Sequence, residues 1–333
     1  HGTKIIFHSG GDVYLLETLL PEQSPQKIEI DYRSPRTQIN RRFVSARHYL
    51  EDFDLHPREE RAVIAARGKT FSLDLWKGPV FQHGQEGALR YRLGRFLSDG
   101  KRVLVVCDAG GEESLEIHDA TNNTIIDRFG DLDIGRSTEM KVSPVADEAL
   151  IVNHRNELVW VDLAKKKFKV LDRSEFSRIY GFNWSPDGRY VAYSCSDSER
   201  TSAIKIAELK SGKVHVVTKP LSKDVKPYWD PAGDYLYFLS YREFDPVYDS
   251  MHFDLSFPRG CKPYLLTLRK DVSAPFSSNF NSVARKKEPK DGKKTIEIDF
   301  TNIADRIVGF PVSDGRYGSV AATKDKVYFS RHI

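Results

Sequence analysis

The chain has 333 residues, which is enough for one large all-β domain or for two smaller domains. It carries 51 basic and 47 acidic residues, and a net charge of only +4 does not favour a nucleic-acid-binding protein. No run of about 18 apolar residues is present, so the sequence predicts no membrane-spanning helix. Cys107, Cys195 and Cys261 lack the spacing of a metal site or a redox motif, and their odd number favours a reducing cytoplasm.

Extended segments start close to the beginning of the chain. Residues 4–30 contain three of them, which we interpret as the second, third and fourth strands of a four-stranded sheet. A repeated pattern follows, in which a turn lies between an apolar residue and a β-branched or aromatic run. The corners of these turns are Pro57, Ser98, Pro144, Pro186 and Pro231. The apolar residues two positions before the corners are Leu55, Phe96, Val142, Trp184 and Trp229.

The spacing of the corners predicts the fold. Successive corners are 41–46 residues apart, which is the period of a propeller blade. A third strand follows each hairpin, as in "KTFSLDLW", and a weaker fourth strand follows it, as in "TIIDRF". We therefore predict an all-β fold, a β-propeller of four-stranded blades, with the apolar residues before the corners packed between blades. A β-solenoid is the alternative, but its repeats are usually shorter.

The fifth repeat is enlarged by two long insertions. Residues 242–261 separate its second and third strands, and residues 271–303 separate the third strand from a fourth strand in "DRIVGFPV". Residues 317–333 then predict a two-stranded hairpin. We place its turn at Lys324-Asp325, and a turn at residues 313–315 is the alternative.

Sequence motifs of catalysis are missing. There is no Gly-x-Ser-x-Gly elbow, no His-Glu-x-x-His helix and no Gly-rich phosphate loop, so we assign no catalytic residue, metal ligand or cofactor. One insertion holds a cluster of titratable residues, which we interpret as caps of loop turns rather than as a metal site. Its members are Asp245, Asp249, His252 and Asp254. Four histidines are expected at the surface: His48, His56, His83 and His118.

The first insertion is more specific than the repeat. Residues 238–276, "FLSYREFDPVYDSMHFDLSFPRGCKPYLLTLRKDVSAPF", resemble the tricorn protease family, which has a "DP..DS..FDLSFP" loop followed by "YLVTLRKD.PSPF". Residues 48–75 are similar to the start of that family's seven-bladed propeller. The stretch "IADRIVGFPVSDGRYGSVAATKDKVYFS" is similar to a later segment. The resemblance extends over nearly the whole chain.

This resemblance implies a domain order and an activity. Residues 41–333 would form most of a seven-bladed propeller, and residues 1–40 would be the terminal part-blade of a preceding six-bladed propeller. The whole protein would be a cytoplasmic, hexameric serine peptidase that degrades oligopeptides, with neither nucleic acid nor a membrane as partner. The family's catalytic motifs lie downstream and have no match here. This chain is thus expected to be a non-catalytic substrate gate, filter and scaffold for the remaining domains.

Basic residues mark the start of each repeat. The position eight residues before the corner is basic in four of the five repeats. Equivalent positions in a propeller form a ring, and a cationic ring at a channel mouth attracts anionic groups such as a peptide's C-terminal carboxylate. Ordinary solvated loop residues are the alternative interpretation. The predicted substrate-gating residues are Arg90, Arg136, Arg178 and Lys223.

Two other functions stay open, and two departures from the family pattern are visible. The turn "WSPDG" also resembles prolyl-oligopeptidase-like propellers, for which a downstream Gly-x-Ser-x-Gly motif would decide. A TolB-like interaction propeller is the other alternative, for which an upstream signal peptide would decide. The turn after Pro144 lacks its Asp-Gly, and the last blade of a seven-bladed ring is not found.

Overall fold

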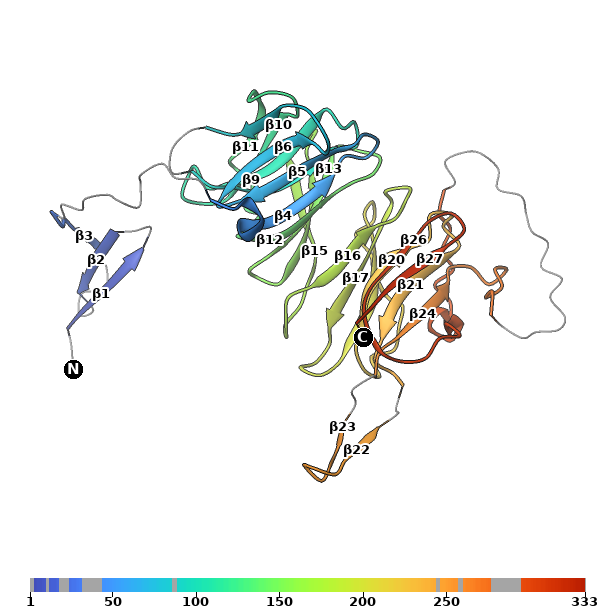
Figure 1. Cartoon of the computed structure of the whole chain (residues 1–333). Coiled ribbons are helices and arrows are strands. Elements are labelled where there is room, and N and C mark those ends of the chain that lie inside the picture. Colours follow the sequence, from blue (N-terminus) through green and yellow to red (C-terminus); the bar gives the residue numbers. More distant parts are fainter. Residues whose placement is uncertain are drawn as a thin grey trace. The chain divides into compact units, whose positions relative to one another are not determined.

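The computed structural model describes residues 3–9, 12–17, 24–31, 44–85, 89–243, 246–256, 260–276 and 295–332. The chain divides into two compact units, residues 1–45 and residues 46–333 (Figure 1). In the described residues, strands dominate, and the helices are two short 3-10 turns, Ala46–Tyr49 (η1) and Ile303–Arg306 (η2). The predicted all-β class is thus confirmed. A search of the described residues for a helix long and apolar enough to cross a membrane finds none.

The first unit contains one antiparallel sheet with the strand order β1-β2-β3. Its strands are β1 (Lys4–Ser9), β2 (Asp12–Glu17) and β3 (Gln26–Ile28). Phe7 and Tyr14 are directly opposite each other, and their rings stack with centroids 5.6 Å apart. The three strands expected between residues 4 and 30 are confirmed, whereas their assignment to a preceding propeller stays a prediction.

Five four-stranded antiparallel sheets make up most of the described part of the second unit (Figure 1). The first sheet has β4 (Leu50–Leu55), β5 (Arg61–Ala66), β6 (Lys69–Asp74) and β7 (Val80–His83). The second has β8 (Tyr91–Phe96), β9 (Arg102–Cys107), β10 (Ser114–Asp119) and β11 (Ile125–Phe129). The third has β12 (Ser137–Val142), β13 (Glu148–Asn153), β14 (Glu157–Asp162) and β15 (Lys167–Arg173). The fourth has β16 (Tyr180–Trp184), β17 (Tyr190–Ser196), β18 (Ser202–Glu208) and β19 (Val214–Val216).

The fifth sheet carries the predicted insertions. Its strands are β20 (Asp224–Trp229), β21 (Tyr235–Ser240), β24 (Lys262–Thr267) and β25 (Ile307–Gly309). A separate hairpin of β22 (Val247–Asp249) and β23 (Asp254–Ser256) lies between β21 and β24 in the chain. The last sheet has two strands, β26 (Arg316–Ala322) and β27 (Val327–His332), so the turn predicted at Lys324-Asp325 is confirmed.

The corner turns form for the reasons that their sequence indicates. In the turn after β16, the Ser185 hydroxyl donates to Asp187 Oδ1 at 2.7 Å and accepts the backbone N–H of Tyr190 at 2.9 Å. Gly188 has a φ of 70°, a conformation that glycine adopts readily because it lacks a Cβ. The turn therefore closes with its polar groups satisfied, and the next strand begins at Tyr190.

Apolar side chains fill the spaces between consecutive sheets. Phe96, Trp184 and Trp229 are buried there, as predicted from their place before the corners. Leu55 is different, because 57% of its surface is exposed. The buried aromatic residues contact the preceding sheet, and within the described part of residues 46–333 no sheet precedes β4–β7 in the chain. The prediction that Leu55 packs between blades is therefore wrong for this unit.

Candidate functional site

The first strands of the five sheets line a cavity of about 480 Å³. β4, β8, β12, β16 and β20 each contribute residues close to the corner turns. Aromatic residues and the corner prolines Pro144, Pro186 and Pro231 form part of the wall. The polar part of the wall comes from equivalent positions of the five strands, three residues before each corner. These residues are Asp54, Arg95, Lys141, Asn183 and Tyr228.

Irregular pairing precedes the polar residue in all five first strands, and in three of them the shift lies directly before it. The register shifts before Arg95 in β8, before Asn183 in β16 and before Tyr228 in β20. Each of these three shifts contains a residue with positive φ: Leu93, Gly181 and Lys226. A bulge of this kind inserts an extra residue and re-aims the side chains that follow it. The side of the strand on which these residues lie therefore cannot be found by counting alternate residues from the start of the strand.

Side-chain donors tie the walls of the cavity to one another through backbone carbonyls. The indole N–H of Trp184 donates to the carbonyl of Lys141 at 3.2 Å, and that of Trp229 donates to the carbonyl of Asn183 at 3.1 Å. The Arg95 Nε donates to the carbonyl of Met140 at 2.9 Å. Each bond joins the first strands of two neighbouring sheets. These bonds hold β8, β12, β16 and β20 together at the corner end, in addition to apolar packing.

The cavity contains charged groups of both signs. Arg95 is paired, because its Nη1 donates to Asp52 Oδ2 at 2.7 Å and to the carbonyl of Gly94 at 2.7 Å. Asp54 accepts the backbone N–H of Phe96 at 3.1 Å, and burial raises the pKa of its carboxyl group although the charge of Arg95 opposes the change. Lys141 donates to Asn183 Oδ1 at 2.8 Å, and burial lowers the pKa of its ammonium group.

The sequence and the fold both match one group of proteins. Residues 50–332 match the family described as "Tricorn protease second beta propeller domain". The chain belongs to the tricorn protease family. The "Putative Tricorn-like protease C-terminal subunit" of Sulfurisphaera tokodaii is 32% identical over 334 residues, which cover 98% of this chain and 36% of that relative. The "Tricorn protease homolog" of Saccharolobus solfataricus is 32% identical over 331 residues, covering 98% of this chain and 29% of the relative.

A solved tricorn structure has the same fold. "Crystal structure of the tricorn protease" superposes with a TM-score of 0.73 and 25% identity, covering 96% of this chain and 30% of that chain. The five four-stranded sheets are therefore blades of a tricorn β-propeller, and the predicted propeller fold is confirmed. The chain spans about a third of the length of the curated relatives named above. The number of blades in a complete ring stays a prediction.

The predicted gating residues of this tricorn propeller lie away from the cavity. Arg90, Arg136 and Lys223 immediately precede β8, β12 and β20, and Arg178 lies two residues before β16. All four are exposed, and the prediction that a first strand begins near each of them is confirmed. A strand rises about 3.3 Å per residue, so about 15 Å of strand separates these positions from the polar residues of the cavity. Their gating role stays a prediction.

Two histidines expected at the surface are buried between the first and second blades. His83 and His118 have no exposed surface, and their rings meet edge to face with centroids 5.6 Å apart. The His83 Nε2 lies 2.9 Å from the hydroxyl of Ser72, and the His118 Nε2 lies 2.9 Å from Glu116 Oε2. Polar partners from the same pair of blades satisfy these nitrogens. Burial, reinforced by His118, lowers the pKa of His83 to about 4.

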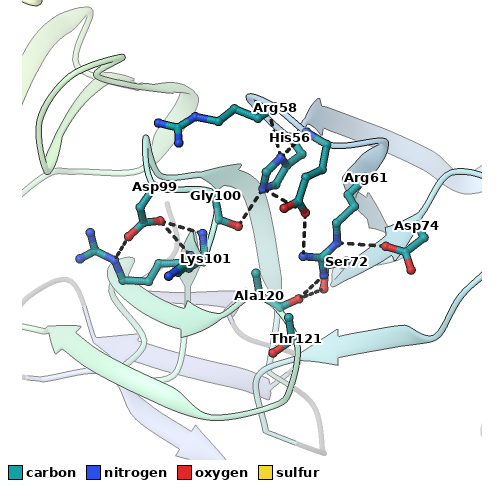
Figure 2. A network of polar contacts seen from close by, with 12 residues as sticks. His56, Arg58, Arg61, Ser72, Asp74, Asp99, Gly100, Lys101, Ala120 and Thr121 are labelled. Atoms are coloured by element: carbon teal, nitrogen blue, oxygen red, sulfur yellow. Dashed lines mark hydrogen bonds and ion pairs between the residues drawn. The ribbon is translucent and has the colours of Figure 1, made fainter.

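His56 is the third histidine for which the prediction of a surface position is wrong. It takes part in polar contacts between the first and second blades, close to the corner turns. Figure 2 shows this network. The His56 Nδ1 accepts the backbone N–H groups of Arg58 and Glu59, so its Nε2 donates to the carbonyl of Gly100 at 3.0 Å. Arg61 donates to the carbonyl of Ala120 at 3.1 Å. Only 4% of the His56 side chain is exposed, whereas His48 is exposed as expected.

The acidic insertion contributes a capped turn. Asp249 Oδ1 accepts the backbone N–H of Met251 at 2.8 Å, and its Oδ2 lies 3.0 Å from the His252 Nδ1. This contact confirms the predicted capping role of Asp249, and Asp254 lies in β23. Asp245 lies outside the described residues. Within the described residues, no group of three His, Cys, Asp or Glu side chains could hold a metal ion.

Sequence reasoning missed the polar residues of the cavity, although a signal for them was present. All five lie three positions before a corner, whereas the predicted ring lies eight positions before it. Their charge varies from blade to blade, so no shared residue type marks them. The position directly before the apolar residue that precedes each corner, as in "NW" and "YW", is the feature that identifies them.

Proposed function

We propose that this chain is the non-catalytic part of a tricorn-type serine peptidase through which oligopeptides reach the active site. The observation that carries this proposal is the cavity, because the first strands of all five described four-stranded blades line it. In this proposal, residues 41–333 form most of a seven-bladed propeller, and residues 1–40 end a preceding one. Catalytic residues belong to the remaining domains of a cytoplasmic hexamer.

Membership of the tricorn family supports this function over the two alternatives. The match to a "Tricorn protease second beta propeller domain" extends over residues 50–332, and it favours neither a prolyl-oligopeptidase-like propeller nor a TolB-like interaction protein. The cavity has polar groups and apolar walls, which suit an extended peptide in transit. The chain itself supplies selection and scaffolding rather than bond cleavage.

A reversible block of the cavity tests the passage of peptides. Phe53 and Tyr228 come from β4 and β20, at the two ends of the described arc of first strands, and both line the cavity. In the full-length peptidase, a Phe53→Cys/Tyr228→Cys variant is treated with a disulfide-containing bismaleimide. The three cysteines of this chain are buried, and the wild-type enzyme treated with the same reagent controls for cysteines in the remaining domains.

We expect the linked enzyme to hydrolyse peptides of about 15 residues much more slowly, and reduction of the linker to restore the rate. Each single-cysteine variant treated with the same reagent is the control. Full activity of a completely linked enzyme on long peptides would contradict passage through this cavity.

The four predicted gating residues need a separate test. We propose that Arg90, Arg136, Arg178 and Lys223 raise the local concentration of anionic peptides at one mouth of the channel. Their joint replacement by Glu in the full-length protein is expected to lower kcat/KM for acidic peptides, with a loss that fades as ionic strength rises. If a folded variant has unchanged kinetics at low salt, these four residues do not attract the substrate. The proposed passage of peptides through the cavity would not be affected by that result.

A further inference from the structure

Asp54 and Lys141 project from different blades into the same cavity. Asp54 lies on β4 and Lys141 on β12, and β8 belongs to the blade between them. Among the described residues, neither side chain has a partner of opposite charge within ion-pair distance. The hydrogen-bond donors to Asp54 are the backbone N–H groups of Phe96 and Leu55, and the acceptor for Lys141 is the side-chain amide of Asn183. Arg95, by contrast, is neutralised by Asp52 at 2.7 Å.

Partial burial makes both charges unfavourable, and the opposite charges of Arg95 near Asp54 and of Glu139 and Asp54 near Lys141 offset this only in part. Burial raises the pKa of Asp54 and lowers that of Lys141, so in each case the neutral form is favoured relative to a residue in water. Neutral hydrogen-bond partners compensate only part of the lost hydration of a charge. A ligand that brings the opposite charge to each group would therefore be bound with a gain at both positions.

We propose that this cavity binds a zwitterionic ligand, a free amino acid or a short peptide, whose carboxylate meets Lys141 and whose ammonium group meets Asp54. The inference rests on the proposed passage of peptides and adds the recognition of both peptide termini. A simple anion would be attracted to Lys141 but repelled by Asp54, and a simple cation would meet the reverse situation. A ligand with both charges avoids this conflict.

The size and the walls of the cavity suit such a ligand. Its volume of about 480 Å³ is in the range of small-molecule sites. Trp184 and Trp229 line it, and their indole N–H groups are already bonded to the carbonyls of Lys141 and Asn183. These residues therefore offer apolar surface, against which the side chain of a bound peptide can pack while its termini reach the charged groups.

Calorimetry with four forms of one peptide tests the proposal on this chain. The ligands are trialanine, its N-acetyl form, its C-terminal amide and the doubly blocked peptide. We expect trialanine to bind with the lowest Kd, each single block to raise Kd at least tenfold, and the doubly blocked peptide to bind weakest. Free alanine is titrated in parallel: tighter binding of alanine than of trialanine assigns the site to amino acids, and the reverse order assigns it to peptides.

Two variants connect each terminus to its residue. Lys141→Met should bind trialanine and its amide with similar Kd values, because the carboxylate has lost its partner. Asp54→Asn, which keeps an oxygen acceptor for Phe96, should no longer distinguish trialanine from its N-acetyl form. Lys167→Met on β15 and Glu51→Gln on β4 are matched controls, because both positions are exposed and the change of charge is the same. Thermal melting verifies that each variant is folded.

Equal affinity of the wild-type chain for trialanine and the doubly blocked peptide would overturn the proposal, and this result needs no variant. Tenfold discrimination that survives in both Lys141→Met and Asp54→Asn would overturn the residue assignment. The linked-cysteine experiment is independent. The linked enzyme could hydrolyse long peptides slowly while the chain binds free and blocked trialanine equally. That result would reject this inference and would still support the passage of peptides through the cavity.

Discussion

The contact between the first and second blades differs in chemistry from the contact between the third and fourth. His83, Ser72 and His118 are fully buried in the first contact; His83 and Ser72 share a hydrogen bond, and the rings of His83 and His118 meet edge to face. The second contact consists mainly of apolar and aromatic side chains, among them Phe182, which has no exposed surface, with polar bonds at Asp172 from Tyr193 and Lys205. Repeats of the same length and strand order are thus joined in two ways. A polar contact depends on protonation and on each partner, whereas an apolar contact depends on volume.

The largest effect is expected from a truncation in the apolar contact. Phe182→Ala should lower the free energy of unfolding by about 3–5 kcal/mol, because it removes a fully buried ring and leaves a cavity. Urea denaturation followed by circular dichroism measures the change. Phe176→Ala is the control, since half of that side chain is exposed. A loss below about 1 kcal/mol for Phe182→Ala would mean that the two blades are not packed as described.

Acid should weaken the polar contact. The unfolded chain binds a proton at His83 near pH 6.5, whereas the folded chain binds it only near pH 4. Stability is therefore lost as the pH falls from about 6.5 to about 4, and the difference of pKa corresponds to about 3 kcal/mol. His83→Gln should remove this part of the pH dependence, measured as the difference between two series of urea melts. The same slope in wild type and variant would contradict the assignment, and His48→Gln should change nothing.

Removal of a single partner in the polar contact should have a smaller effect. Ser72 donates to the carbonyl of Ala120 at 2.7 Å and contacts His83 at 2.9 Å, so Ser72→Ala leaves buried polar atoms without partners. The expected loss is about 1–3 kcal/mol. A Ser72→Ala/His83→Phe double variant should lose less than the sum of the two single losses, because both partners are then apolar. Additive losses would indicate that the two side chains are not coupled.

The smallest effect is expected at a surface pair that joins the second and third blades. Arg102 contacts both carboxylate oxygens of Asp147, at 2.7 and 2.8 Å, and both side chains are partly exposed. Asp147→Asn should reduce stability by at most about 1 kcal/mol, and less at high salt. Thermal melting at 0.05 and about 1 M salt measures the change. A larger loss of stability that does not depend on salt would indicate that this ion pair behaves like the buried polar contacts.

The strand order and the corner turns could be predicted from the sequence because they depend on local chemistry. Proline and glycine fix the corners, and the spacing of Pro144, Pro186 and Pro231 repeats the length of one blade. Burial between blades could not be predicted with the same certainty. His83 and His118 are polar, and their burial depends on partners from other strands, which no local pattern reveals.

The residues of the cavity depend on the bulges of the first strands. A bulge at Leu93, Gly181 or Lys226 shifts the alternation of side chains by one position. The residue three positions before a corner lies between the bulge and the corner, so the bulge does not change the side of the strand on which its side chain is expected. Counting over eight positions crosses it, and the predicted ring therefore describes the start of the strands rather than the wall of the cavity.

The bonds between neighbouring first strands have a consequence for how this wall can evolve. The indole N–H of the tryptophan at one corner donates to a backbone carbonyl of the preceding first strand, at Lys141 or Asn183, and not to the side chain that faces the cavity. Every amino-acid residue has this backbone carbonyl, whatever its side chain. A substitution at position 141 or 183 can thus change the charge of the wall while the tryptophan bond persists, although it removes the side-chain bond between Lys141 and Asn183. At these two positions, the tryptophan bond between blades is therefore independent of the side chain that faces the cavity.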